Sequence, residues 1–379
     1  MTLEVGAAGT ISPPVEALLH TAKRNEEKGY DAIWYPDHWM AWHSESIWTP
    51  DVTQIANFQP NPHVYLDPVA CMAAVGVHTE TIRLGTSVTE PIRRHPALLA
   101  NEWLTLDHLT KGRTILGIGA GEAENITPYG LDYSKQVSKF EEALTIIRLL
   151  WENDDPVDFD GQFWTLKRAV NGMQPFRPGV FPEIWTGAHG PRMLDITGRL
   201  ADGWLPSLLP PDDFEQRLTR MRAVAREAGR GDDAITAGMW FLAVVDEDHE
   251  TAHRLVNDRI VRGFLLTLPD EAFARHGAPH PLGEGAYGLR EYIPTMWQKE
   301  EMLAALDAIP DEVAHEYILH GTPDEIVATC RDYEARGLQH VVLWNITFLG
   351  DLTKVGSSYH LMDDVMRALK APAQQGAPA

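Results

Sequence analysis

The chain has few cysteines and no long apolar run, and both absences narrow its class. Only two of its 379 residues are cysteines, Cys71 and Cys330, and neither belongs to a Cys-x-x-Cys pair. This excludes a disulfide framework and a zinc ribbon, and both cysteines fall in apolar helical patterns typical of a core. No apolar stretch approaches the roughly 18 residues that cross a bilayer, and no signal peptide is visible. We therefore expect a cytoplasmic protein without a transmembrane segment.

Positive charge is also scarce. The chain carries 32 lysines and arginines against 54 acidic residues, a formal net charge of −22. Such a surface would repel nucleic-acid phosphates and anionic membranes, so neither is an expected partner. The excess of acidic residues favours solubility.

Several catalytic motifs are missing. No Gly-x-Ser-x-Gly elbow of a serine hydrolase is present, and Gly117, Gly119 and Gly121 do not follow the Gly-x-Gly-x-x-Gly dinucleotide fingerprint. The 16 histidines form no His-Glu-x-x-His. His315 and His320 lie five residues apart, a spacing that does not share a helix face. No metal site is predicted.

Short β-rich runs alternate with helical patterns along the chain. Eight runs are predicted as strands: residues 3–7, 31–35, 83–88, 113–119, 183–186, 202–205, 236–245 and 340–345. Apolar rather than alternating strands indicate a parallel sheet covered on both faces. A (β/α)8 TIM barrel, formed by a single domain over residues 1–370, is the simplest arrangement at this length. An open doubly wound sheet is the alternative, and residues 371–379 read as a disordered tail.

Connections between the strands carry further predicted elements. Residues 97–109 and 249–264 are each predicted as one helix, and residues 157–166 as a hairpin with Asp160-Gly161 at its centre. Residues 265–309 read as a long irregular insertion.

The strand over residues 31–35 ends in the strongest chemical signal. It breaks at Pro36 and is followed at once by Asp37, His38 and two tryptophans. In a barrel the carboxyl ends of the strands form the active face, and another strand delivers Glu122 there. Imidazole titrates near neutral pH, so His38 and Glu122 form a candidate acid/base pair. The alternatives are a core strand with an aromatic loop, and a Glu122 that merely caps a helix.

Four motifs together are specific. They are Asp37-His38-x-x-x-Trp42, Leu84-Gly85-Thr86-Ser87-Val88, Gly119-Ala120-Gly121-Glu122-Ala123-x-Asn125 and Ala201-Asp202-Gly203. With them the chain resembles the luciferase-like superfamily, and within it the branch that uses the deazaflavin coenzyme F420. The resemblance covers residues 3–369. It extends to F420-dependent glucose-6-phosphate dehydrogenases and, through residues 46–51, to the phthiodiolone ketoreductase group.

The resemblance implies a role for each matching residue. His38 and Glu122 would handle protons, and Trp42 would cover the substrate. Ser87-Val88 would form a non-proline cis peptide against the deazaflavin. The expected cofactor contacts are Asp37, Ser87, Val88, Glu90, Gly121, Asn125, His189, Gly190, Arg192 and Met193, with Arg192 near a phosphate. The implied reaction is hydride transfer between F420 and a carbonyl or alcohol.

Departures from the sugar-phosphate enzymes bear on the substrate. Pro210 and Glu316 stand where those enzymes carry a lysine and an arginine that hold the phosphate. His189 replaces a frequent glycine, and Ser12 replaces an acidic residue. We therefore expect a ketone or alcohol more apolar than a sugar phosphate.

Two other functions remain as alternatives, and the sequence also predicts an oligomeric state. The chain could be an FMN-dependent monooxygenase of the same fold or a non-catalytic cofactor-binding barrel. Barrels of this superfamily usually pair through helices near the second and third strands. Residues 97–109 carry Leu98, Leu99, Trp103, Leu104 and Leu106, more apolar surface than one core-facing stripe uses. A homodimer is predicted.

Overall fold

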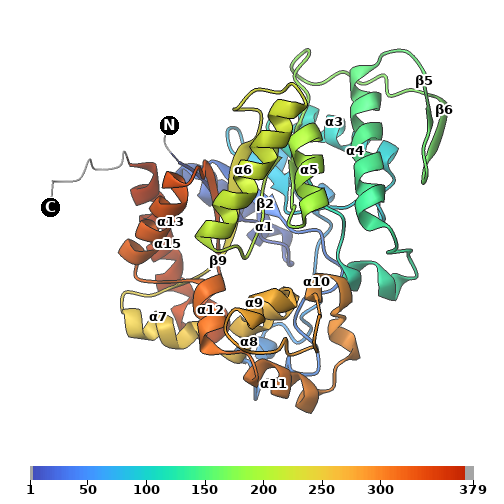
Figure 1. The fold of residues 1–379 in the computed structure, drawn as a ribbon. Coiled ribbons are helices and arrows are strands. Elements are labelled where there is room, and N and C mark those ends of the chain that lie inside the picture. The colour runs from blue at the N-terminus through green and yellow to red at the C-terminus, as the bar shows by residue number, and fades with distance from the viewer. Residues whose placement is uncertain (1–2, 372–379) are drawn as a thin grey trace.

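Eight parallel strands close into a barrel in the computed structural model, which describes residues 3–371 (Figure 1). The strands are β1 (Glu4–Ala8), β2 (Ala32–Tyr35), β3 (Arg83–Thr86), β4 (Thr114–Ile118), β7 (Glu183–Thr186), β8 (Gly203–Trp204), β9 (Thr236–Val245) and β11 (His340–Asn345). Each pairs with its neighbour in parallel, and β8 pairs with β9 to close the ring. The predicted (β/α)8 TIM barrel is confirmed. The predicted disordered tail lies outside the described residues, apart from Ala371.

The interior of the barrel is filled by side chains. Trp34 and Trp185 are fully buried there with their ring centroids 5.2 Å apart, and Trp34 Nε1 donates to His340 Nε2 at 2.9 Å. Glycines on neighbouring strands make room for these rings, because a Cβ at Gly85 would lie 2.6 Å from Trp34 and one at Gly203 would lie 2.2 Å from Trp185. The barrel is therefore a packed core rather than a pore.

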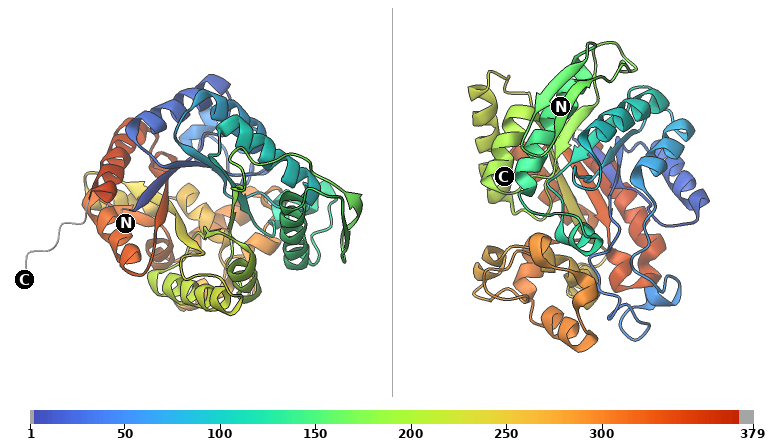
Figure 2. Two further views of the ribbon diagram at one scale, coloured as in Figure 1. Left: turned by 90° about the horizontal axis from the view of Figure 1, so that it is seen from above. Right: turned by 90° about the vertical axis from the view of Figure 1, so that its right-hand side faces the viewer.

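Helices surround the strands, as the view down onto the molecule shows (Figure 2, left). They are α1 (Val15–Lys28), α2 (Pro68–His78), α3 (Pro96–Thr110), α4 (Gln136–Glu152), α5 (Pro191–Leu200), α6 (Pro211–Glu227), α7 (His249–Val256), α13 (Pro323–Ala335) and α15 (Val355–Lys370). The apolar faces of all of these except α7 share one large core with the outward faces of the strands, and α7 packs into a second core. Cys71 and Cys330 are buried in it as free thiols, as predicted.

Helix α3 does not carry the surplus apolar surface that the sequence suggested. Leu99, Trp103, Leu104 and Leu106 are at most 1% exposed, and only Leu98 remains open, at 47%. The reason is that α3 packs against α2, α4 and β4 together, so one core-facing stripe is not enough. The inference of unused surface was wrong, and the homodimer stays a prediction.

The segment after β9 differs most from its prediction. The helix expected over residues 249–264 is broken at Asn257, and α8 (Arg259–Arg262) begins after Asp258, whose side chain accepts from the N–H of Ile260. The expected irregular insertion is largely helical, because its apolar residues form a second core. Its elements are η4 (Gly263–Thr267), α9 (Asp270–Ala274), α10 (Gly288–Glu291), η5 (Pro294–Met296), α11 (Lys299–Asp307) and α12 (Asp311–Tyr317).

Further short elements complete the chain. Strand β10 (Leu319–Gly321) pairs with the last residues of β9. The predicted hairpin is present as β5 (Val157–Asp160) and β6 (Thr165–Ala169), at the edge of the molecule in Figure 1. The remaining turns are η1 (Gln54–Asn57), η2 (Ala123–Asn125), η3 (Thr127–Tyr129), α14 (Thr347–Gly350) and η6 (Leu352–Lys354). Within residues 3–371, every helix is too short or too polar to span a bilayer.

Candidate active site

His38 is held in one orientation by the amide of Asn125. The Oδ1 atom of Asn125 accepts from the backbone N–H groups of Trp39 at 2.6 Å and Met40 at 3.1 Å. The amide nitrogen therefore faces His38 Nδ1, 2.7 Å away, and donates to it. Because Nδ1 accepts, a neutral His38 carries its proton on Nε2. One loop after β2 and one after β4 thus fix a single tautomer.

Two carboxyl groups lie on the Nδ1 side of this ring. Glu124 Oε1 is 3.6 Å and Glu122 Oε2 4.0 Å from His38 Nδ1. Trp42 Nε1 donates to both carboxyl groups, at 3.1 Å each. Glu122 precedes η2 but makes no side-chain cap, which removes the helix-capping alternative. His38, Glu122 and Trp42, the three predicted catalytic residues, are therefore brought together.

The shared environment sets the protonation of the cluster. Burial raises the pKa of Glu124 well above the usual range of a glutamic acid, and the charge of Glu122 and a hydrogen bond with Glu122 raise it further. Burial lowers the pKa of His38, although Glu122 partly opposes this effect. The cluster therefore favours a neutral imidazole and favours the protonated form of Glu124 more than an exposed glutamic acid would.

Asp37 and Glu90 are occupied by arginines rather than open to a ligand. Asp37 Oδ1 lies 3.2 Å from Arg93 Nη1, and Asp37 Oδ2 accepts from Thr89 Oγ1 at 2.7 Å. Glu90 accepts from Arg93 Nε at 2.6 Å. Arg94 also reaches Asp37, at 3.4 Å. These groups brace the loop that carries His38.

Ser87 and Val88 form a cis peptide bond at the end of β3. The Ser87 hydroxyl is buried and has no hydrogen-bond partner among residues 3–371. The Val88 side chain lies over Gly119 and Gly187, where a Cβ would approach it to 2.9 Å and 3.3 Å. Gly121 has φ +88°, a conformation that favours glycine. The predicted strand-end residues thus lie at the same end of the barrel as His38.

The loop from β7 into α5 carries the other predicted cofactor contacts. A Cβ at Gly190 would meet nothing within 4 Å, so this turn borders open space. Burial, and then the charge of Arg217, lower the pKa of His189 to about 4, so its ring is neutral. Arg192 instead pairs with Glu141 at 3.0 Å, and the Met193 side chain packs into the core. The cofactor contacts predicted for Arg192 and Met193 stay predictions.

An aromatic row leads away from His38. The ring centroids of His38 and Trp42 are 5.1 Å apart, those of Trp42 and Phe264 5.7 Å, and those of Phe264 and Trp344 5.2 Å. Trp240 follows at 6.0 Å from Trp344. The row joins the loop after β2, the insertion, the end of β11 and the middle of β9. It provides an apolar surface beside the acid/base cluster.

Sequence reasoning missed two features of these regions. Glu124 was passed over as the variable position between Glu122 and Asn125, although a second acid two residues on was a visible signal. The spacing of His315 and His320 also gave no sign that their rings meet. They do not share a helix, because α12 ends at Tyr317 and His320 lies on β10, and the turn between them brings their rings together.

Comparisons with known proteins agree with this geometry. The sequence model of the luciferase-like monooxygenase family matches residues 2–340. A phthiodiolone/phenolphthiodiolone dimycocerosates ketoreductase from Mycobacterium sp. (strain JLS) is 34% identical over 345 residues, which cover 90% of each protein. A 5,10-methylenetetrahydromethanopterin reductase from Archaeoglobus fulgidus is 30% identical over 327 residues, covering 86% of this chain and 88% of the reductase. The chain belongs to the luciferase-like monooxygenase family.

Solved structures show the same fold. An F420-dependent secondary alcohol dehydrogenase, solved with an F420-acetone adduct, superimposes with a TM-score of 0.74. It is 22% identical, and the match covers 97% of this chain and 99% of that one. The predicted family is confirmed, and the prediction of an oxidoreductase is confirmed at the level of enzyme class.

Proposed function

We propose that the protein is a coenzyme F420-dependent oxidoreductase that transfers a hydride between the deazaflavin and the carbonyl carbon of a ketone, or back from the alcohol. The observation that carries the proposal is the cluster of His38, Asn125, Glu122 and Glu124 at the carboxyl end of the barrel. Ketone reduction needs a proton for the oxygen, and this cluster stores one. The names of the ketoreductase relative and of the alcohol dehydrogenase structure support the same chemistry.

The residues present fit a deazaflavin. The buried hydroxyl of Ser87 has no partner and offers a hydrogen bond. Val88 provides an apolar contact beside it, and the space at Gly190 lies at the first turn of α5, where backbone N–H groups favour an anion. When bound, coenzyme F420 supplies or accepts the hydride. Asp37 and Glu90 act indirectly on the cofactor, because they hold in place the loop that carries His38.

The proton moves through His38. Its Nε2–H donates to the substrate oxygen as negative charge develops there. Nδ1 then takes the proton stored by Glu124 and Glu122, so the ring never becomes an anion. Because Asn125 is clamped by two backbone amides, a proton on Nδ1 would oppose its amide donor. The Nδ1–H tautomer therefore returns to the Nε2–H tautomer: Nδ1 gives its proton back to the carboxyl pair and Nε2 takes one from solvent. Glu122, with 26% of its side chain exposed, keeps the carboxyl pair in exchange with solvent.

An apolar substrate suits the surroundings. The row from Trp42 to Trp240 places four aromatic rings beside the cluster. At the two positions that hold phosphate in sugar-phosphate enzymes, Pro210 caps α6 and Glu316 accepts from His276 at 2.6 Å. Neither position supplies a cation. A ketone or secondary alcohol with an apolar chain is the proposed substrate class.

Cofactor titration tests the proposal. Protein stripped of bound cofactor is titrated separately with F420 and FMN, and ketone reduction and alcohol oxidation are then followed with each. We expect F420 to bind far more tightly than FMN and to support turnover of apolar substrates over glucose 6-phosphate. Equal or tighter FMN binding with oxygen consumption would favour a monooxygenase. F420 binding without turnover across the panel would favour a non-catalytic barrel.

We also propose a cytoplasmic homodimer. Three apolar side chains of α2 and α3 remain open: Val77 at 66%, Leu98 at 47% and Leu109 at 37% exposure. Light scattering at micromolar concentration should give twice the chain mass, and a monomer mass would contradict the dimer.

A further inference from the structure

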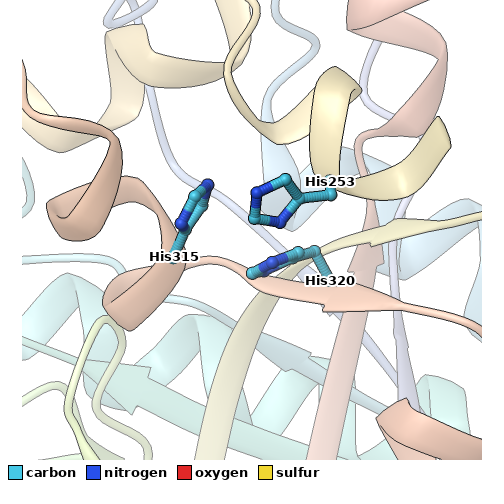
Figure 3. Close-up of side chains that lie close together, drawn as sticks. All are labelled: His253, His315 and His320. Carbon is cyan, nitrogen blue, oxygen red and sulfur yellow. The ribbon is translucent and has the colours of Figure 1, made fainter. Parts of the chain in front are cut away.

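A cluster of three histidines, separate from the His38 cluster, lies where β10 pairs with the last residues of β9. His253 of α7, His315 of α12 and His320 of β10 point toward one another (Figure 3). One ring nitrogen of each lies within 4.8 Å of those of the other two. The closest ring centroids, of His253 and His315, are 4.1 Å apart. All three residues are half-buried, so the cluster is accessible from solvent.

Hydrogen bonds orient these rings outside the cluster. The Nδ1 of His320 donates to the carbonyl of Ile318 at 2.9 Å, which leaves the Nε2 lone pair free. The amide of Asn257 lies 3.2 Å from His315 Nε2, and its Oδ1 is buried without a hydrogen-bond partner. Turning this amide over lets Oδ1 accept from a protonated Nε2 and leaves the Nδ1 lone pair of His315 free. Such outer-shell bonds are how proteins prepare histidine ligands.

The protonation states agree. The pKa of His315 is lowered to about 4, chiefly by burial and then by the neighbouring imidazoles, and burial also lowers the pKa of His320. Metal ions bind neutral imidazole. Of residues 3–371, no carboxylate belongs to the cluster, so an ion preferring oxygen ligands is disfavoured.

We propose that His253, His315 and His320 bind a divalent transition-metal ion such as Zn²⁺, with Asn257 as the residue that orients His315. Ligand nitrogens about 2.0–2.1 Å from zinc require the rings to move closer by roughly 1 Å. The fourth position stays open to water. The ion would fasten α12 and β10 to α7, and so hold the insertion onto the barrel. This proposal is independent of the proposed function.

Metal titration of the full chain, purified without a histidine tag and stripped with chelator, tests the site. Calorimetry with Zn²⁺ should give one equivalent of tight binding, and Co²⁺ should give the intense visible bands of a four-coordinate ion. His315→Ala and His320→Ala should each weaken binding by more than the roughly 100-fold upper range for an outer-shell loss. Asn257→Ala should weaken it by about 10–100-fold. Zn²⁺ should raise the Tm of the parent protein but not that of His315→Ala or His320→Ala.

His249→Ala is the matched control. His249 lies against His253, with ring centroids 5.7 Å apart, but its Nδ1 is paired with Glu325 at 3.0 Å. This variant should bind Zn²⁺ as the parent does. The proposal is overturned if His315→Ala and His320→Ala both keep the tight equivalent, or if the parent binds none. His315→Phe, which preserves ring volume, repeats the test should the alanine variant not fold.

Discussion

Two pairs of acids lie at the same end of the barrel and are held in opposite ways. Asp37 and Glu90 each meet Arg93, so their charges are matched within a buried network. Glu122 and Glu124 meet a neutral histidine, an amide and an indole, and no lysine or arginine within residues 3–371 forms an ion pair with either. The first arrangement stabilises a loop, and we propose that the second stores a proton. Charge compensation, rather than position at a strand end, separates the structural acids from the chemical ones.

The largest expected effect concerns the matched pair. Arg93→Met leaves Glu90 without its cation and Asp37 with Arg94 alone, and the side chains of Arg93, Asp37 and Glu90 are at most 5% exposed. We expect the free energy of unfolding to fall by about 3 kcal/mol, the lower end for a broken buried pair. Urea denaturation measures it. Arg192→Met, which breaks an exposed pair with Glu141, should lower the free energy of unfolding by no more than about 1 kcal/mol. Equal losses in Arg93→Met and Arg192→Met would contradict the distinction between a buried charge network and an exposed pair.

Removing the imidazole should strike turnover rather than binding. His38→Ala should lower the rate of hydride transfer by roughly 10²–10⁴-fold, as for a lost general acid. F420 affinity should stay close to that of the parent, because Ser87 and the Gly190 turn lie elsewhere. Stopped-flow measurements at saturating cofactor report the step directly. A folded variant that reacts at nearly the parental rate would leave the carboxyl pair as the proton source.

Glu122→Gln tests the connection between the stored proton and solvent. The amide keeps the shape of the carboxyl group but cannot exchange a proton. We expect turnover to fall by roughly 10²-fold, the lower end of acid–base effects. Single-turnover hydride transfer should fall less than steady-state turnover, since one proton is still stored on Glu124. Equal losses in both would place Glu122 in the transfer step itself.

We expect Glu124→Gln to have the smallest effect on the rate and the clearest effect on the pH dependence of stability. The folded state raises the pKa of Glu124, so it binds a proton that the unfolded chain releases. That contribution to stability is full below the ordinary pKa of glutamic acid and is lost as pH rises through the raised value. Glu124→Gln should therefore remove this loss on the alkaline side, while lowering ketone reduction by less than the roughly 10²-fold at the lower end of acid–base effects. Denaturation across pH measures the change in stability, and rate profiles across pH measure the change in ketone reduction. A parent protein whose stability does not fall on the alkaline side would contradict a stored proton.

Much of the barrel could be predicted because its strands are apolar runs with sharp ends. The predictions for β7, β9 and β11 match the structure residue for residue. The break at Asn257 and Asp258 was not predicted, since it depends on a capping side chain inside a pattern that otherwise continues. Helix α15 was not predicted either, although Met362, Val365, Met366 and Leu369 repeat at helical spacing and are buried.

The site was predictable as a set of residues but not as a set of contacts. His38, Glu122, Trp42 and Asn125 converge as the motifs implied. That Asp37 and Glu90 bind arginines could not be read from the sequence, because Arg93 and Arg94 approach only when the loops after β2 and β3 pack together. Likewise, the raised pKa of Glu124 arises from burial by residues distant in the chain.

The two tryptophans that fill the barrel interior limit how bound molecules can leave the site. With Trp34 and Trp185 filling the interior, reactants have no rear exit. A molecule bound deepest at the barrel mouth must therefore leave last, because a molecule bound above it blocks its exit. For the proposed reaction, the relative depth of product and cofactor sets the order in which they leave. Product-inhibition patterns measure that order.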